Sequence, residues 1–209
     1  FLLSYSKNIS YQYFRFIYCK MKYILDHLSK YDIILGSQSP RRQELLAGLN
    51  INFRVESIYV EETYPETLVG VDIPMYLAQK KAQAFTLEEN TMLITADTIV
   101  WHEGAVYGKP DDWTDAKRML LTLSGKMHQV ITGVCITTKR KRRVFHVISD
   151  VYFARFNEAE VDYYLENYEP YDKAGSYGVQ EWIGYIGVER IEGSYFNVMG
   201  LPVQRLYNE

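Results

Sequence analysis

One segment, DIILGSQSPRRQELLAGL at residues 32–49, constrains the fold of this chain more than any other. Its apolar run at residues 33–35 predicts a buried strand, and a Gly-Ser loop follows it. Ser39 is a favoured N-cap residue, and Pro40 suits the first position of a helix. A strand that leads through a glycine loop into a helix N-terminus is typical of α/β folds. In open α/β sheets this junction lies at the ligand-binding edge.

Two arginines, Arg41 and Arg42, stand in the first turn of that expected helix. A cation there opposes the helix dipole, whose N-terminal end is already positive, so the placement calls for an anion nearby. One interpretation is a solvated helix face with an ion pair to Glu44. The other is an oxyanion site, in which free backbone N–H groups and two guanidiniums bind a phosphate together. The position at a helix N-terminus favours the phosphate site.

The rest of the chain alternates strand and helix patterns, which predicts a mixed α/β fold. Residues 51–65 read as a strand running into an acidic loop with Glu61 and Glu62, and a helix opens at Asp72 with Lys81 on its apolar stripe. A lysine in such a stripe either snorkels outward or reaches into a cleft. Further expected elements are strands at 91–102, 128–138, 144–156 and within 185–191, a hairpin turn at 103–104, and helices at 114–123 and after Asn157, whose capping box includes Glu160.

The most informative charged residue is Asp97, a carboxylate within an apolar strand. Because a lone buried charge is costly, Asp97 is either a structural group that caps a turn or pairs with an arginine, or a metal ligand or general base. The functional interpretation is favoured because Glu62, Lys81 and Lys109 are also available. Cations that spread phosphate charge, with carboxylates that hold a metal or activate water, suit a polyphosphate. The residues alone indicate a metal-dependent phosphohydrolase or a nucleotide-binding module.

Composition argues against several other classes of protein. The formal net charge of −3 and the pI near 5.9 give no global basic field, so stable nucleic-acid or membrane binding is not expected. The basic run at residues 139–143 reads as a solvated hairpin tip, because no aromatic residues interleave with it. The two cysteines, Cys19 and Cys135, and the four histidines lack metal-ligand spacing, which argues against structural zinc. The cysteine usage fits a cytoplasmic protein.

The first 20 residues precede the sequence MKYIL and have short apolar runs interrupted by Lys7, Arg15 and Lys20. They match neither a signal peptide nor a membrane span. We expect residues 1–20 to be an extension outside the core and residues 21–209 to form a single domain. The alternative is that residues 1–20 contribute a first strand or helix.

Six motifs occur in a recognisable order and spacing over about residues 32–206: SQSPRRQELL, the helix carrying KKA, ADTIV, GKP, EPYDKAGSYGVQ and GSYFNVMGLP. Together they resemble the Maf family of nucleoside triphosphate pyrophosphatases. The resemblance implies a mixed α/β fold with an elongated central sheet, two lobes around a cleft, and a homodimer. It also implies cleavage between the α and β phosphates of a nucleoside triphosphate, giving the monophosphate and pyrophosphate in a house-cleaning role.

The resemblance carries roles over to individual residues. Asp97 matches the family's proton acceptor, and Glu62, together with Asp97, would hold a divalent cation, Mg²⁺ or Mn²⁺. The residues that match the phosphate-binding set are Ser37, Arg41, Arg42, Lys81 and Lys109.

The chain is similar to the branch of the family that carries A-D-T and Y-G-[IV]-Q and acts on dTTP and UTP. The specificity positions correspond to Arg41, Thr98 and Gln180. An amide such as Gln180 can both donate to and accept from the O4/N3 edge that uracil and thymine share. Gln38 and Glu181 depart from the family pattern, since each stands where glycine is usual.

Three other functions stay open. The first is the same chemistry on a modified pyrimidine nucleotide or on 7-methyl-GTP, the substrate of the S-D-Q branch. The second is a non-catalytic nucleotide-binding regulator of cell division, which would bind nucleotide without turnover. The third is RNA binding through residues 139–143, which would show a steep dependence on salt.

Overall fold

The computed structural model describes residues 26–209 of the chain. The expected extension at residues 1–20, with Cys19, lies outside the described residues. The chain divides into two units at Asp32, and the described part of the first unit contains the short 3-10 helix η1 (Asp26–Leu28). The second unit, residues 33–209, carries the sheet and all the elements that follow.

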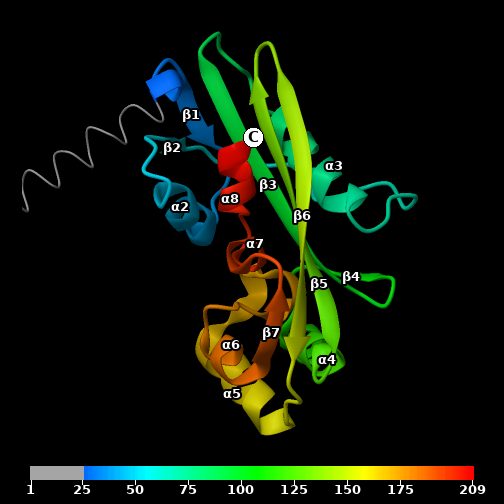
Figure 1. Cartoon of the computed structure of the whole chain (residues 1–209). Helices are drawn as coiled ribbons and strands as arrows, with labels where there is room; N and C mark the ends of the chain where they lie inside the picture. Colours follow the sequence, from blue (N-terminus) through cyan, green and yellow to red (C-terminus); the bar gives the residue numbers. More distant parts are fainter. Residues whose placement is uncertain (1–25) are drawn as a thin grey trace, which may run out of the picture. The chain divides into compact units, whose positions relative to one another are not determined.

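One mixed seven-stranded sheet forms the centre of the fold in the part of the chain that the structure describes (Figure 1). The strands run in the order β2-β1-β3-β5-β6-β7, and β4 pairs with the end of β3. The pair β1–β2 is parallel, whereas β3–β4, β3–β5, β5–β6 and β6–β7 are antiparallel. Their bounds are β1 (Asp32–Leu35), β2 (Arg54–Val55), β3 (Thr91–His102), β4 (Ala105–Tyr107), β5 (Met127–Thr138), β6 (Arg142–Phe153) and β7 (Val188–Glu192). The mixed α/β fold class is confirmed.

Helices flank this sheet, and several begin where the sequence predicts. They are α2 (Pro40–Ala47), α3 (Asp72–Gln83), α4 (Trp113–Leu123), α5 (Glu158–Tyr168), α6 (Trp182–Gly187), α7 (Tyr195–Met199) and α8 (Val203–Asn208), with 3-10 turns η2 (Pro170–Asp172) and η3 (Ala174–Ser176). Ser39 caps α2, and Asn157 and Glu160 form the expected capping box of α5. Among residues 26–209, no helix combines the length and the apolar character that crossing a bilayer requires.

The two faces of the sheet carry different helices, and neighbouring residues of one strand therefore face different partners. A Cβ added to Gly133 of β5 would lie 2.3 Å from the backbone of α3, so α3 packs closely on that face. On the opposite face, the hydroxyl of Thr132 donates to the carbonyl of Asn197 in α7 at 3.2 Å. The strand register pairs Asp97 with Gly133 and Thr98 with Thr132. Asp97 thus belongs to the α3 face and Thr98 to the α7 face.

Separate apolar cores lie toward the two ends of the long strands. One, built on α4, α5 and the ends of β3, β5 and β6, includes Leu120, Phe153 and Leu165. Another packs Ala78 and Ala82 of α3 against β1, β3 and β5. Figure 1 shows α4, α5 and α6 gathered at one end of the sheet and α2 and α3 toward the other. This arrangement agrees with two lobes on one elongated sheet.

Two strand predictions are wrong in part. The strand expected at the start of residues 51–65 is reduced to the two residues of β2, whereas the acidic loop expected after it is present and brings Glu62 to the cleft. The core strand expected within residues 185–191 begins only at Val188, because residues 182–187 form α6. β7 is also an edge strand with mostly exposed side chains, since it pairs with β6 alone. Short apolar runs do not distinguish helix from strand, which explains the error.

Candidate active site

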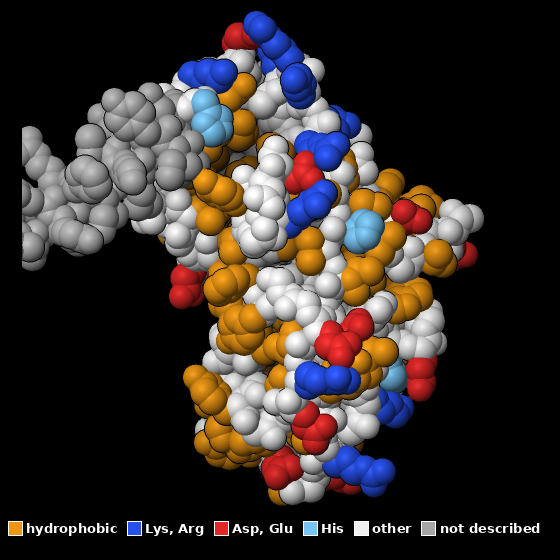
Figure 2. Space-filling model, viewed as in Figure 1, with side chains coloured by type: hydrophobic (Ala, Val, Ile, Leu, Met, Phe, Trp, Pro, Cys, Tyr) orange, Lys and Arg blue, Asp and Glu red, His pale blue; other side chains and the backbone are white. Residues whose placement is uncertain are grey.

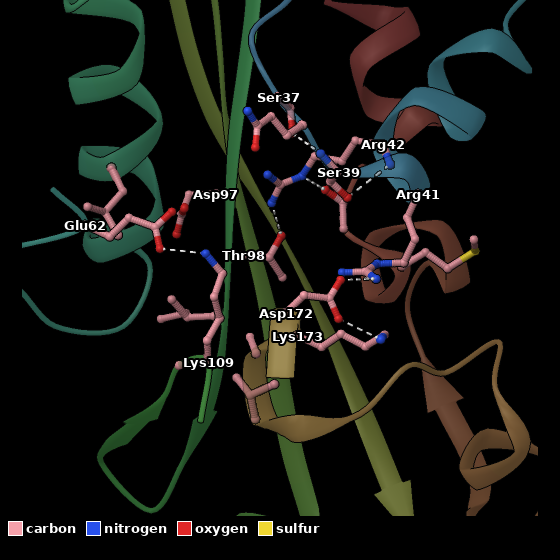
Figure 3. Close-up of a pocket in the computed structure, with 18 of the residues that line it drawn as sticks. Ser37, Ser39, Arg41, Arg42, Glu62, Asp97, Thr98, Lys109, Asp172 and Lys173 are labelled. Carbon is pink, nitrogen blue, oxygen red and sulfur yellow. Dashed lines mark hydrogen bonds and ion pairs between the residues drawn. The ribbon is translucent and has the colours of Figure 1, made fainter. Parts of the chain in front are cut away.

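A cleft of about 700 Å³ lies between the two lobes (Figure 3). Three stretches of the chain meet there: the loop and first turn of α2, the segment around residues 58–64, and the glycine-rich loop at residues 172–180, with β3 as the floor. All nine residues predicted as site residues line this cleft: Ser37, Arg41, Arg42, Glu62, Lys81, Asp97, Thr98, Lys109 and Gln180. A concave site of this size suits a small-molecule ligand.

The cleft opens beside the middle of β3, between two points at which other strands join it. Gly36, at the end of β1, donates its N–H to the carbonyl of Ile94 at 2.8 Å. Further along, β4 pairs with β3 from Val100 onward. Asp97 and Thr98 lie between these points, so the fold presents them to the cleft.

A lysine–carboxylate cluster occupies the α3 side of the cleft, and we define it as Glu62, Lys81, Asp97 and Lys109. The Nζ atom of Lys81 lies 2.6 Å from Oδ1 of Asp97 and 2.9 Å from Oε1 of Glu62. Lys109 donates to the other oxygen of Glu62 at 2.9 Å. Lys81 is 8% exposed, so this lysine of the apolar stripe reaches into the cleft instead of snorkelling outward.

The two carboxylates of this cluster are used differently. Burial alone would raise the pKa of Glu62, but the charge and hydrogen bond of Lys81, and then those of Lys109, lower it from 4.5 to about 2. Both oxygens of Glu62 are engaged by lysines. Asp97 uses only Oδ1 within residues 26–209, which leaves Oδ2 able to accept from a molecule in the cleft.

The carboxylate oxygens of this cluster could bind a divalent cation that enters the cleft together with a phosphate-bearing ligand. Within the part of the chain that the structure describes, no group of three or more His, Cys, Asp or Glu side chains could hold a metal ion. Glu62 and Asp97 nevertheless offer two carboxylates. Mg²⁺ is commonly bound through one or two carboxylates together with substrate phosphates, and the remaining positions are filled by water. Their assignment as metal ligands stays a prediction.

Arg42 is held by the protein through all three of its guanidinium nitrogens. Nε donates to the carbonyl of Gly200 at 2.8 Å, Nη1 to that of Ala96 at 2.9 Å, and Nη2 to the hydroxyl of Thr98 at 3.0 Å. Burial lowers the pKa of Arg42, and Arg41 adds to this, while Asp97 acts in the opposite direction. Arg42 thus ties α2 to β3 and to the end of α7. Two of its five N–H groups remain for a phosphate, a role that stays a prediction.

The specificity candidate Thr98 belongs to the same hydrogen-bonded network. Its Oγ1 accepts from Arg42 and lies 3.0 Å from Oγ1 of Thr132. Thr132 in turn donates to the carbonyl of Asn197. The hydroxyl of Thr98 is therefore fixed in position before any ligand binds.

Arg41 has a partner that the sequence did not reveal. Its Nη1 donates to Oδ2 of Asp172 at 3.0 Å, although the two residues are 131 positions apart (Figure 3). Lys173 donates to the other oxygen of Asp172 at 2.7 Å. Burial alone would raise the pKa of Asp172, but the hydrogen bond from Lys173 and the charge of Arg41 produce a net lowering. Asp172 and Lys173 are adjacent in the sequence, but nothing local connects them to Arg41.

Gln180 and Gln38 both line the cleft, and only one of them is held by hydrogen bonds among residues 26–209. The Oε1 atom of Gln180 is buried and has no hydrogen-bond partner among the described residues. Gln38 donates through Nε2 to the hydroxyls of Ser57 at 2.7 Å and Tyr59 at 2.9 Å. The residue that departs from the expected glycine therefore ties the phosphate-binding loop to the segment at residues 58–64.

The basic run at residues 139–143 forms a separate feature at the β5–β6 turn, where Figure 2 shows Lys and Arg side chains gathered. Arg140 pairs with Glu89 at 2.6 Å, and Arg143 pairs with Glu209 at 2.5 Å. Carboxylates thus balance part of its charge. None of its residues lines the cleft.

Comparison with known proteins adds a family and close relatives. The protein family described as "Maf-like protein" matches residues 32–209 of this chain. A dTTP/UTP pyrophosphatase of Phocaeicola vulgatus is 57% identical over 189 residues, which covers 89% of this chain and 98% of the relative. A dTTP/UTP pyrophosphatase of Porphyromonas gingivalis is 56% identical and covers 89% and 96%. A solved structure of a HAM1 protein from Coxiella burnetii is 18% identical, with a TM-score of 0.42, and covers 60% and 74%.

Proposed function

This chain belongs to the Maf-like protein family, and on that premise we propose that it is a nucleoside triphosphate pyrophosphatase acting on dTTP and UTP. The products are the nucleoside monophosphate and pyrophosphate. The observation that carries this proposal is the position of Asp97. Its carboxylate is buried at the floor of the cleft, touches one lysine, and keeps an oxygen available to a water.

The reaction is a displacement by water at the α-phosphorus. A water oxygen forms a bond to the α-phosphorus, the bond from that phosphorus to the bridging oxygen breaks, and pyrophosphate leaves. Oδ2 of Asp97 takes the proton of the attacking water, as a general base within hydrogen-bond reach. The Nζ atom of Lys81, 2.6 Å from Oδ1, holds the Asp97 carboxylate in orientation.

The cations of the cleft stabilise the triphosphate and its leaving group. The Lys109 side chain is exposed to the cleft, where it can contact phosphate, and Arg41 lines the cleft as well. Ser37, Arg42 and Lys81 complete the phosphate-binding set that the resemblance implies. Phosphoryl transfer depends mainly on such positioning and charge stabilisation.

Glu62 and Asp97 would hold a divalent cation, Mg²⁺ or Mn²⁺, that enters with the nucleotide. When bound there, the cation would supply charge neutralisation at the phosphates and a lower pKa for its bound water. The low pKa of Glu62, about 2, keeps this ligand ionised at neutral pH.

Base selection falls to Arg41, Thr98 and Gln180. Gln180 lines the cleft, and once its side chain turns toward the base its amide oxygen can accept from N3–H of uracil or thymine while its amide nitrogen donates to O4. Cytosine presents the opposite pattern on that edge, so an amide held in this one orientation would be left unpaired by cytosine.

Pyrophosphate release, measured over a panel of canonical and modified triphosphates with and without Mg²⁺ or Mn²⁺, tests the proposal. We expect turnover with dTTP and UTP that requires the cation. If 7-methyl-GTP is turned over best, the protein catalyses the same reaction on a different nucleotide. If nucleotides bind without any turnover, the result favours a non-catalytic nucleotide-binding regulator. Loss of RNA binding, but not of hydrolysis, on neutralising residues 139–143 would identify that run as a separate site.

The resemblance also leads us to propose a cytoplasmic homodimer. Light scattering coupled to size-exclusion chromatography gives the mass directly against the 24.5 kDa of one chain. A mass of one chain at all concentrations would contradict the dimer.

A further inference from the structure

A second buried lysine lies at the base-selecting side of the cleft, and its partners are not explained by the proposed chemistry. Lys173 is 8% exposed, and its Nζ contacts Oδ1 of Asp172 at 2.7 Å and Oε1 of Glu181 at 3.1 Å. Glu181 does not line the cleft, yet it follows Gln180 directly in the chain. We define the Lys173 network as Arg41, Asp172, Lys173, Glu181 and Tyr164.

We propose that Glu181 is a positioning residue for base selection, which acts by holding the loop at residues 177–180 in place. This inference rests on the proposed pyrophosphatase function and assigns to that site a determinant of specificity. Glu181 touches neither the phosphates nor the base in this account. It acts through Gln180 on one side and Lys173 on the other.

The carboxylate of Glu181 is the junction of the network. Oε1 receives Lys173, and Oε2 accepts a short hydrogen bond from the phenol of Tyr164. Tyr164 is fully buried in the core of its lobe, so it provides a rigid anchor. Burial and the adjacent Glu181 both raise the pKa of Tyr164 above its ordinary value, which keeps the phenol protonated as a donor.

The phenol also holds the loop itself. The N–H of Gly178 donates to the Tyr164 hydroxyl at 3.0 Å, so one hydroxyl joins Gly178 to Glu181. The loop is closed again by the N–H of Glu181, which donates to the carbonyl of Gly178 at 2.9 Å. The segment between them contains Gln180, whose amide lines the cleft.

The side chains of Gln180 and Glu181 pack so closely against Gly178 that a side chain there would force them to shift. A Cβ built there would lie 2.7 Å from the carboxyl carbon of Glu181 and 2.8 Å from Nε2 of Gln180. The backbone of Gly178 therefore lies against both side chains. A shift of the Glu181 carboxylate displaces the surface against which the Gln180 amide rests.

The network reaches the other specificity candidate through Lys173. Asp172 lies between Lys173 and Arg41, at 2.7 Å and 3.0 Å (Figure 3). Hydrogen bonds and ion pairs join five residues in a continuous series that leads from the wall of the cleft into the core of the lobe: Arg41, Asp172, Lys173, Glu181 and Tyr164. Two residues expected to select the base are thus braced by one set of charges.

The test compares Glu181→Gln and Tyr164→Phe with the unchanged chain in full kinetics with UTP and CTP. Glu181→Gln keeps the size of the side chain but removes the charge that faces Lys173, and Tyr164→Phe removes a single hydroxyl. We expect the KM for UTP to rise about tenfold and the preference for UTP over CTP to fall about as much, since small misplacement of a positioning group costs this order of rate. The kcat for UTP should change less than about twofold, because Asp97 lies on a different element.

Two controls separate positioning from a general loss of structure. Glu189→Gln neutralises an exposed carboxylate on β7 and should leave both nucleotides unaffected. The double variant of Glu181→Gln and Tyr164→Phe should be no worse than the more severe single variant, because both changes break the same contact. Thermal unfolding of each variant shows whether it is folded at the assay temperature.

The outcomes are distinct. Unchanged KM and unchanged UTP preference in both folded single variants would overturn the inference and leave the pyrophosphatase proposal intact. Equal falls in kcat with both nucleotides, without a change in preference, would also overturn it, since they indicate only a structural role. Absence of turnover by the unchanged chain would overturn the proposed function and this inference together. If Glu181→Gln does not fold, the KM for UTP and the preference for UTP over CTP measured with Tyr164→Phe test the inference instead.

Discussion

Two buried lysines of this protein each bridge a pair of carboxylates, and the difference between the two clusters separates chemistry from positioning. Lys81 joins Glu62 to Asp97, and Lys173 joins Asp172 to Glu181. The exposed fraction of each lysine is 8%. In the first cluster Asp97 keeps one oxygen without a partner in residues 26–209, whereas in the second both oxygens of Glu181 are engaged.

The scaffolds of the two clusters also differ. Lys81 and Asp97 stand on the regular elements α3 and β3, which pack face to face on the sheet. Asp172 ends the 3-10 turn η2, Lys173 lies between η2 and η3, and Glu181 occupies the N-cap position of the short helix α6. A reacting group needs a rigid element beneath it, while a loop can be adapted to the ligand it selects. We therefore expect damage to the first cluster to abolish turnover and damage to the second to alter substrate preference.

The largest expected effect is that of Asp97→Asn. The amide cannot accept a proton from water at neutral pH, so pyrophosphate release should fall about 10³-fold with both dTTP and UTP. Stopped assays for pyrophosphate measure the loss, and circular dichroism checks that the fold is retained. Near-normal turnover would remove Asp97 from its proposed role.

The next largest expected effect is the loss of stability caused by Lys81→Met. This change leaves the carboxylates of Glu62 and Asp97 facing each other without their shared cation, and we expect a loss of about 2 kcal/mol in the free energy of unfolding. The loss should shrink in acid, because protonation removes the repulsion. Urea denaturation at several pH values measures it.

The matched control for this change is the neighbouring Lys80→Met. Lys80 is a partly exposed lysine of the same helix, and its hydrogen-bond acceptors among residues 26–209 both belong to Thr63. Its replacement should cost little at any pH. Equal losses from Lys80→Met and Lys81→Met would show that the bridge between carboxylates is not what stabilises this part of the fold.

A smaller effect is expected from Asp172→Asn in the second cluster. The pair of Arg41 and Asp172 is partly exposed, with side-chain exposures of 22% and 57%, so its energetic contribution is small. We expect the KM for UTP to rise less than about fivefold, with kcat preserved. A fall in kcat comparable to that of Asp97→Asn would erase the distinction between the two clusters.

The last prediction concerns a pH dependence of stability that belongs to Glu62. Its pKa in the folded protein, about 2, lies below the ordinary 4.5, so its stabilising contribution is present above pH 4.5 and is lost as the pH falls toward 2. Glu62→Gln should therefore lower stability near neutral pH and converge with the unchanged chain in acid. Glu61→Gln, a change at the exposed neighbouring carboxylate, should show no such convergence.

Much of the first cluster could be predicted from the sequence because its signals are local. The apolar strand around Asp97 and the stripe containing Lys81 each predict their element, and β3 has the expected bounds. The capped start of α2 likewise follows from Ser39 and Pro40. The roles of these residues came from the resemblance, whereas their meeting in one cleft is shown by the structure.

The second cluster could not be predicted, because its contacts join distant loops. No periodicity relates Asp172 to Arg41, and Glu181 was visible only as a residue in place of an expected glycine. Gln38 is a similar case, since its bonds to Ser57 and Tyr59 depend on how two irregular segments meet. Irregular backbone has no repeating pattern from which such pairs can be inferred.

The central claim is that water attacks the α-phosphorus in the cleft beside Asp97. Hydrolysis of UTP in oxygen-18-labelled water, followed by mass spectrometry of the products, tests it most directly. The account predicts one labelled oxygen in UMP and none in pyrophosphate. Label in pyrophosphate or in inorganic phosphate, or no hydrolysis at all, would contradict it.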